Sequence, residues 1–294
     1  MKFFIIIILL LSFNLYADDV DTAKGNILKK ITSNISSSLE NLIGGEGDTE
    51  VKITAGEDYK PEYSIMTVRP LATHPGVDAW FVQFQLNDSK IRGKSRNSIN
   101  AGLGYRKLSE TKNSFAGANV FIDYDEKENS RVSIGLELRS SSFEALVNYY
   151  EATSNANTVG LFTERALSGS EISLVGELPY LPWASIIANH YQWEAVKNAK
   201  NSTGDKISLE MTITPNLIVE AGLDDNNISG TRNYGKIFFV FPARENVAAT
   251  TKFVADTAFS QSDMSLELLS KVRRTNKIVI ESEGTGVVIA RAIE

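Results

Sequence analysis

The chain has 294 residues, a formal net charge of −6 at pH 7, two histidines and no cysteine. A mildly acidic chain offers no basic patch for nucleic acid, so we exclude nucleic-acid binding as a function class. The lack of cysteine excludes disulfides and thiolate metal sites, and the sequence predicts neither a metal site nor a cofactor.

Residues 1–17 have the composition of a secretory signal peptide. Lys2 supplies a positive charge, residues 3–11 are apolar, and Ala17 precedes two aspartates, so we expect cleavage after Ala17. The apolar run is too short to cross a bilayer as a helix. No later apolar run approaches the roughly 18 residues of a membrane-spanning helix, so we exclude a helical membrane protein.

Residues 18–48 predict a short periplasmic helical leader before the first strand. Apolar residues recur there at helical spacing, and they end before Gly44 and Gly45, residues of the kind that commonly terminate helices. These apolar residues are Ile27, Leu28, Ile31, Ile35, Leu39 and Leu42. A loosely ordered leader is the alternative interpretation of this stretch.

Residues 98–150 carry the alternation around which we interpret the rest of the chain. In the first run, one face consists of Ile99, Ala101, Leu103 and Tyr105, and the other of Asn100, Gly102, Gly104 and Arg106. A period of two residues indicates β-strands with one wet face and one dry face. Repeated strands of this kind, about 9–11 residues long, are typical of an outer-membrane β-barrel.

The same pattern predicts an all-β fold over residues 49–242, an antiparallel transmembrane β-barrel of about twelve strands. The predicted strands are residues 49–54, 63–71, 79–87, 98–108, 115–125, 130–139, 143–151, 170–179, 184–194, 206–214, 217–225 and 235–242. Short connections alternate with longer polar ones, as periplasmic turns alternate with outer loops in such barrels. A soluble sandwich or a lipocalin-like barrel would show the same alternation. The strand lengths, the signal peptide and the lack of cysteine favour the membrane.

Residues 243–294 lose this alternation and predict a linker. Residues 262–274 predict a helix that Ser262 or Asp263 caps and that has cations in its last turn. The elements predicted after it are an extended run at 277–281, a turn at 283–286 and a second short run at 287–291.

Six stretches of the chain share their sequence pattern with one known family. They are NAGLGYR (100–106), GANVFIDYD (117–125), RVSIGLELRS (131–140), GELPYLPW (176–183), SLEMTITPNL (208–217) and VRRTNKIVIE (272–281). In this order they resemble the inverse autotransporter β-domain, the type V secretion translocator of intimins and invasins. The resemblance implies a twelve-stranded barrel in the bacterial outer membrane with its N-terminus in the periplasm. It also implies that the linker passes back through the pore to the outside, where it carries adhesin domains in the family.

The sequence departs from the family after the linker, where no immunoglobulin-like repeat follows. We therefore expect a translocator-type barrel without an adhesin passenger. The expected partners are outer-membrane lipid, the barrel-assembly machinery and periplasmic chaperones, with a separate passenger left open. No small-molecule substrate is evident.

Charged residues on the inward face of the predicted strands suggest how the linker is held. They are Arg106, Asp123, Arg131, Glu137, Arg139, Glu210 and Glu220, and the linker offers Arg273, Arg274 and Lys277 as a plug. A charged linker in a charged lumen would form ion pairs that are partly shielded from water, for instance between Arg274 and Glu210. The alternative is that these cations only cap a periplasmic helix.

Two other functions fit the same barrel. An open porin-like channel would leave residues 243–294 in the periplasm. A lipid hydrolase would need a serine, a histidine and an orienting group together, and only His190 of the two histidines lies in a predicted strand. We expect no catalytic residues and no enzymatic activity.

Overall fold

A computed structural model describes residues 46–56, 59–197, 200–243, 253–259, 261–284 and 287–291. The predicted signal peptide with its cleavage at Ala17, and nearly all of the predicted leader over 18–48, lie outside the described residues. Among the residues described, no helix is both long enough and apolar enough to cross a membrane.

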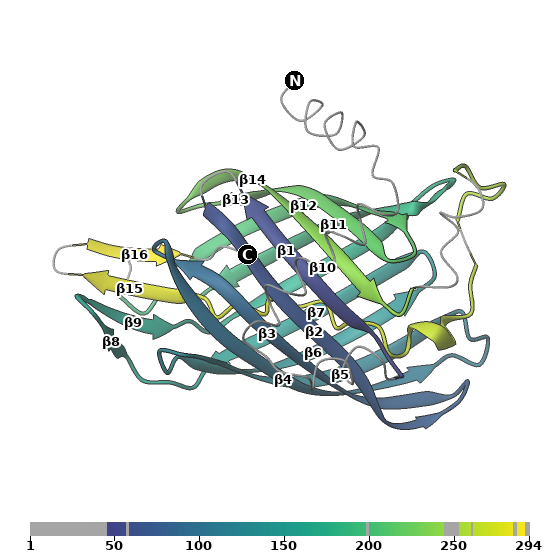
Figure 1. The fold of residues 1–294 in the computed structure, drawn as a ribbon, viewed down its shortest axis with the longest axis horizontal. Helices are drawn as coiled ribbons and strands as arrows, with labels where there is room; N and C mark the ends of the chain where they lie inside the picture. Colours follow the sequence, from purple (N-terminus) through teal and green to yellow (C-terminus); the bar gives the residue numbers. More distant parts are fainter. Residues whose placement is uncertain are drawn as a thin grey trace. The chain divides into compact units, whose positions relative to one another are not determined.

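Twelve strands form a closed antiparallel barrel (Figure 1). They are β1 (Thr49–Gly56), β2 (Tyr59–His74), β3 (Asp78–Ile91), β4 (Lys94–Leu108), β5 (Ser114–Asp125), β6 (Ser130–Ser140), β7 (Phe143–Ala152), β10 (Gly169–Leu178), β11 (Leu181–Trp193), β12 (Ser202–Thr214), β13 (Leu217–Asn226) and β14 (Gly230–Phe241). Each barrel strand pairs with the barrel strands before and after it, and β1 pairs with β14 to close the ring. The predicted all-β antiparallel barrel is therefore confirmed, and each predicted strand overlaps one barrel strand.

Strand β6 shows how the alternation produces two different faces. The outward side chains of Val132, Ile134, Leu136 and Leu138 are 39–57% exposed. The inward side chains of Arg131, Ser133, Glu137 and Arg139 are at most 6% exposed. Because successive side chains of a strand point to opposite faces, one run supplies both an apolar outer surface and a polar lumen.

The two ends of the barrel differ in their connections. At the proximal end, where β1 begins and β14 ends, the connections are residues 75–77, 109–113, 141–142, 179–180 and 215–216. The two longest connections, residues 153–168 and 194–201, both lie at the opposite, distal end.

The connection between β7 and β10 is one of the longer polar connections expected from the sequence, and it contains a hairpin. Its strands are β8 (Asn157–Val159) and β9 (Phe162–Ala166). The end of the chain forms a second hairpin of β15 (Ile280–Gly284) and β16 (Val287–Arg291). Strand β15 pairs antiparallel with β9, so the two hairpins make a four-stranded sheet in the order β16-β15-β9-β8. The pairing partner of β9 lies over a hundred residues along the chain, which explains why local sequence did not reveal it.

The helix predicted over residues 262–274 is wrong in extent. The structure has only a short 3₁₀-helix, η2 (Met264–Glu267), and Asp263 caps it by accepting a hydrogen bond from the Ser265 amide at 2.8 Å. Beyond η2 the carbonyl groups accept hydrogen bonds from barrel side chains, and a longer α-helix would have used those carbonyls internally. Met264 and Leu268 pack in a cluster with Ala79, Leu108 and Phe115, which places η2 just inside the barrel.

The alternation predicts that charge is tolerated differently along the outer face. Ile134→Arg, at the middle of β6, should lower the free energy of unfolding in lipid vesicles by about 2–4 kcal/mol, because the cation enters the apolar band. Leu71→Arg, close to the proximal turn at the end of β2, is the control and should lower it by about 0–1 kcal/mol. Equal losses at the two positions in a urea titration would contradict a membrane-spanning outer face.

Candidate functional site: the lumen segment

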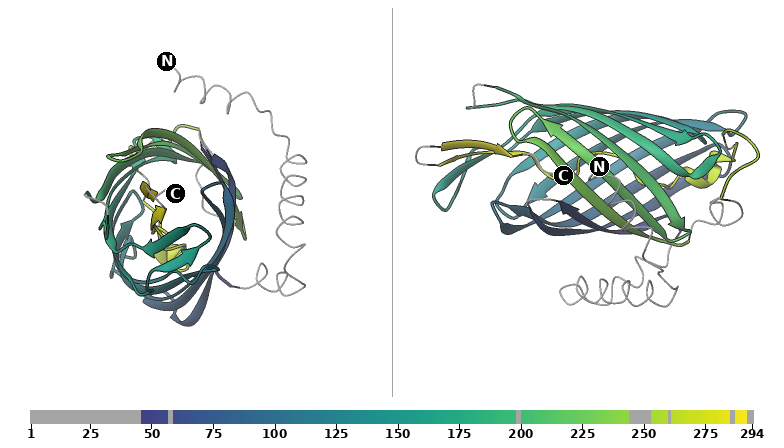
Figure 2. Two further views of the ribbon diagram at one scale, coloured as in Figure 1. Left: turned by 90° about the vertical axis from the view of Figure 1, so that its left-hand side faces the viewer. Right: turned by 90° about the horizontal axis from the view of Figure 1, so that it is seen from above.

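Residues 268–279 cross the barrel lumen between η2 and β15 without forming a helix or a strand, and we call them the lumen segment. Figure 2 shows this part of the chain inside the ring of strands. The seven charged residues predicted to line the pore all lie on the inner face of the barrel. Arg106, Asp123, Arg131, Glu137, Arg139 and Glu220 are at most 5% exposed, and Glu210 contacts the lumen segment directly.

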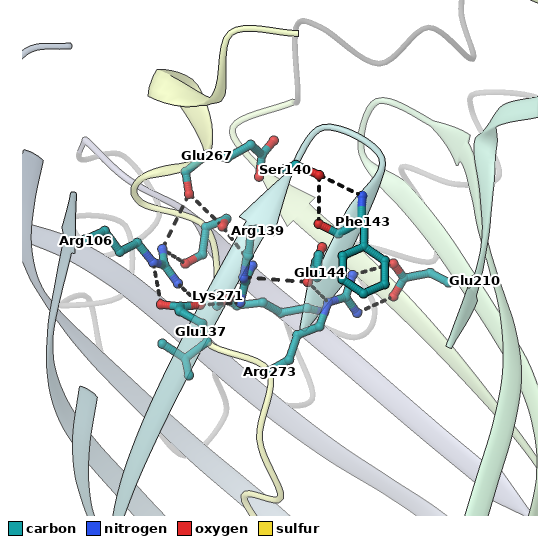
Figure 3. A network of polar contacts seen from close by, with 12 residues as sticks. Arg106, Glu137, Arg139, Ser140, Phe143, Glu144, Glu210, Glu267, Lys271 and Arg273 are labelled. Carbon is teal, nitrogen blue, oxygen red and sulfur yellow. Dashed lines mark hydrogen bonds and ion pairs between the residues drawn. The ribbon is translucent and has the colours of Figure 1, made fainter. Parts of the chain in front are cut away.

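Near the proximal end, the Glu137 carboxylate lies between two arginines (Figure 3). Arg106 binds it through Nε at 2.7 Å and Nη2 at 3.2 Å, and Arg139 through Nη2 at 2.8 Å. These side chains come from β4 and β6, which flank β5, and they meet over Gly117 of that strand. All three are almost fully buried, so the pairing is needed to keep the charges stable away from water.

Arg273 of the lumen segment bridges β7 and β12, two strands that are separated in the ring by β10 and β11 (Figure 3). Its Nε donates to Glu144 at 3.0 Å, and its Nη1 and Nη2 donate to Glu210 at 3.0 and 2.7 Å. The pair suggested from the sequence, Arg274 with Glu210, is therefore wrong by one residue. Consecutive side chains of a non-helical chain point in different directions, so only one of two adjacent arginines can face β12.

Arg274 points to the opposite wall and forms a bidentate pair with Asp123, at 2.9 Å through Nη1 and 2.7 Å through Nη2. Asp123 also accepts a hydrogen bond at 2.6 Å from Nε of Arg131, the residue directly opposite it in the β5–β6 pair. One buried carboxylate thus holds a cation of the barrel and a cation of the lumen segment. Forked guanidinium–carboxylate pairs of this kind are both strong and directional.

The remaining cations of the lumen segment also meet barrel carboxylates. Lys271 Nζ lies 2.6 Å from Glu50, and Lys277 Nζ lies 2.7 Å from Glu62. Thr275 donates its hydroxyl to Glu171 at 2.6 Å.

Sequence reasoning missed these four barrel partners, which are Glu50, Glu62, Glu144 and Glu171. Each lies within or next to a predicted strand. The period of two residues, applied to every strand rather than to the central ones, was the signal that could have found them.

Two aromatic rings pack against the guanidinium groups of Arg274 and Arg106 on the side of the barrel wall. The Arg274 guanidinium lies 4.3 Å from the Phe121 ring, and that of Arg106 lies 4.4 Å from the Phe81 ring. Each ring covers an inward glycine, since a Cβ at Gly102 would lie 2.3 Å from Phe121 and one at Gly104 would lie 2.2 Å from Phe81. The glycines therefore make room for rings that stack under a cation.

The lumen segment does not fill the lumen. A polar cavity of about 120 Å³ lies beside it, and Lys52, Lys206, Glu220 and Lys236 are among its lining residues. Within the described part of the chain, no group of three or more histidine, aspartate or glutamate side chains is arranged to hold a metal ion. What the lumen offers chemically is a set of ionic and hydrogen-bonding groups for a polypeptide.

Charged residues also close the distal end. Glu164 of β9 is fully buried and lies 2.5 Å from Nη2 of Arg92 and 2.9 Å from Nη2 of Arg96. Glu281 of β15, equally buried, accepts hydrogen bonds from the amides of Val196 and Lys197 at 3.0 and 2.8 Å. These contacts fasten the hairpin of β9 to the turn between β3 and β4 and to β4 itself, and the hairpin of β15 to the connection after β11.

The sequence and the fold of the chain are similar to those of known outer-membrane barrel proteins. The family model for the inverse autotransporter, beta-domain, matches residues 10–276. A solved structure from work on the mechanism of in-meso crystallisation of membrane proteins is 22% identical, with a TM-score of 0.63, over 81% of this chain and 99% of that chain.

Two further solved structures match less closely. The KdgM porin is 7% identical, with a TM-score of 0.46, over 65% of this chain and 98% of its own. Outer membrane phospholipase A from Escherichia coli is 9% identical, with a TM-score of 0.44, over 70% of this chain and 97% of its own. No curated protein matches. At these identities the similarity to the first structure shows the fold alone, and the other two carry no argument about function.

The geometry of Arg273 predicts a specific pattern of energetic coupling. A double-mutant cycle of Arg273→Gln with Glu210→Gln should give a coupling of about 0.5–3 kcal/mol in the free energy of unfolding. The matched cycle of Arg274→Gln with Glu210→Gln should be additive within about 0.5 kcal/mol. Coupling in the second cycle and none in the first would show that the register of the lumen segment is different.

The glycine–aromatic contacts predict that two glycine-to-alanine variants differ in stability. Gly104→Ala should destabilise the barrel by about 1–3 kcal/mol in urea unfolding, because the new methyl group displaces the Phe81 ring from below Arg106. Gly176→Ala in β10 is the control, since a Cβ there meets nothing within 4 Å. If both variants unfold at the same urea concentration, Gly104 is not needed to make room for the Phe81 ring.

Proposed function

The chain belongs to the inverse autotransporter β-domain family, and from this premise we propose that its barrel leads the C-terminal part of the chain from the periplasm to the cell surface. As a member of that family it is a translocator-type β-barrel of the bacterial outer membrane. The observation that carries the proposal is the lumen segment, which joins η2 at the proximal end to β15 at the distal end. In this proposal the segment stays in place as a plug.

The proposal assigns a direction to the barrel. The proximal end, with its turns, faces the periplasm, and the distal end, with the two longest connections, faces the outside. Lys271, Arg273 and Arg274 then hold the segment through the ion pairs with Glu50, Glu210 and Asp123 described above. The open porin-like alternative would leave this part of the chain in the periplasm, and those ion pairs argue against it.

We further propose that the protein works without catalysis. The histidine of the hydrolase alternative, His190, pairs with Asp205 at 2.8 Å, and both side chains are more than half exposed. The proposed partners are outer-membrane lipid on the apolar outer face, and periplasmic chaperones and the barrel-assembly machinery during insertion. A surface-displayed passenger, as in the adhesins of the family, is the proposed cargo.

Cysteine labelling tests the direction of the barrel, because the chain has no cysteine of its own. Glu283→Cys in β15 should react with a membrane-impermeant maleimide in intact cells, since that side chain is 41% exposed at the distal end. Leu266→Cys in η2, where the native side chain is 66% exposed at the proximal end, should react only after the outer membrane is permeabilised. The reverse pattern, or reaction of neither cysteine in intact cells, would contradict the proposal.

A further inference from the structure

The barrel contacts the lumen segment in two chemically different ways. The ion pairs of Arg273 and Arg274 join side chain to side chain and depend on the sequence of the segment. A second set of contacts joins barrel side chains to the backbone of the chain, from Glu267 onward. Backbone groups are the same in nearly every residue, so these contacts carry no information about the sequence they bind.

Three barrel arginines, which we call the arginine wall, supply five hydrogen bonds to backbone carbonyls. They are Arg106 of β4 with Arg131 and Arg139 of β6. Arg106 Nη1 donates to the carbonyls of Glu267, Leu268 and Ser270 at 3.4, 2.9 and 2.6 Å (Figure 3). Arg139 Nη2 donates to the Lys271 carbonyl at 2.8 Å, and Arg131 donates to the Thr275 carbonyl.

Neutral side chains of the same part of the barrel continue the pattern. Asn148 donates to the Arg273 carbonyl at 3.2 Å, and Asn100 donates to the Asn276 carbonyl at 2.9 Å. Gln83 accepts a hydrogen bond from the Val272 amide at 2.8 Å. Strands β3 to β7 therefore bind both the carbonyl and the amide groups of the chain.

The arginine wall is held in position by groups of the barrel itself. Arg106 uses Nε and Nη2 for Glu137 and rests on the Phe81 ring, which leaves Nη1 for carbonyl groups. Arg131 is fixed by Asp123, and Arg139 by Glu137. Donors that are oriented beforehand lose little conformational freedom when a chain binds.

We propose that the arginine wall is a binding site for non-helical polypeptide in general, which recognises carbonyl groups whatever the side chains. The inference rests on the proposed function, since it extends from the resident segment to every segment that crosses the lumen. The side-chain ion pairs then determine where the chain stops. The polar cavity beside the lumen segment gives side chains of other sizes room on the side away from the wall.

Amide hydrogen exchange measured on the full chain tests this, because it reports the segment and the barrel strands separately. The wall variant combines Arg106→Met with Glu137→Met, which removes both members of one buried ion pair. Arg139 then keeps Glu144, 3.6 Å from its Nε, as its carboxylate partner. Exchange in the peptide that covers residues 268–279 should become at least about tenfold faster, the lower end for one lost hydrogen bond to a charged group. Exchange in the barrel strands should stay unchanged, which shows that the barrel is folded.

Sequence independence is tested by repeating the comparison in a chain with altered side chains at the wall. This chain carries Glu267→Ala and Ser270→Ala, at two of the residues whose carbonyls bind Arg106. The wall variant should accelerate exchange by the same factor in this chain as in the original one. No acceleration in either chain, or a factor that shrinks in the altered chain, would overturn the proposal.

Two further variants keep the result interpretable. The matched control, Lys236→Met with Glu220→Met, removes a lumen ion pair from strands β13 and β14 and should leave exchange of the lumen segment as it is.

If the wall variant accelerates exchange in the barrel strands too, Arg106→Lys replaces it, because lysine keeps the charge beside Glu137 but not the forked donors. Acceleration confined to the segment then supports the proposal, and its absence overturns it. Failure of the translocator function would appear separately, in the labelling of Glu283→Cys.

Discussion

The structure depends on one constraint, which is that every charge facing the lumen needs a partner. The Asp123 carboxylate illustrates it, because a buried acid between Arg131 and Arg274 is stable only while both cations remain in place. Removing one member of such a buried pair typically destabilises a protein by about 3–5 kcal/mol. The barrel therefore needs the lumen segment for its own electrostatic balance, and the segment needs the barrel to keep its cations compensated.

The alternation of side chains along each strand produces both the charged lumen and the apolar outer face. In β6 it places Ile134 and Leu136 on the outer face and Arg131 and Glu137 on the inner face. The same period gives the barrel an apolar surface that lipid can cover and a lumen that an apolar chain would not enter. The lumen segment occupies part of this polar lumen, beside the polar cavity.

Much of this could be predicted from the sequence, because alternation is a local property. All twelve barrel strands and the inward position of Arg106 and Asp123 followed from it. The partner of Arg273 did not, because pairing across the lumen depends on the stagger and radius of the closed barrel. The pairing of β9 with β15 and the shortness of η2 also depend on contacts distant in sequence, which decide whether carbonyl groups bond locally or to the wall.

Single-channel conductance of the full chain in a planar bilayer tests whether ion pairs hold the lumen segment in the pore. The unaltered protein should be closed for most of the recording, because the lumen segment occupies the pore. Arg273→Gln with Arg274→Gln should produce long open periods of higher conductance. Identical recordings from the two proteins, both open or both closed, would contradict the account.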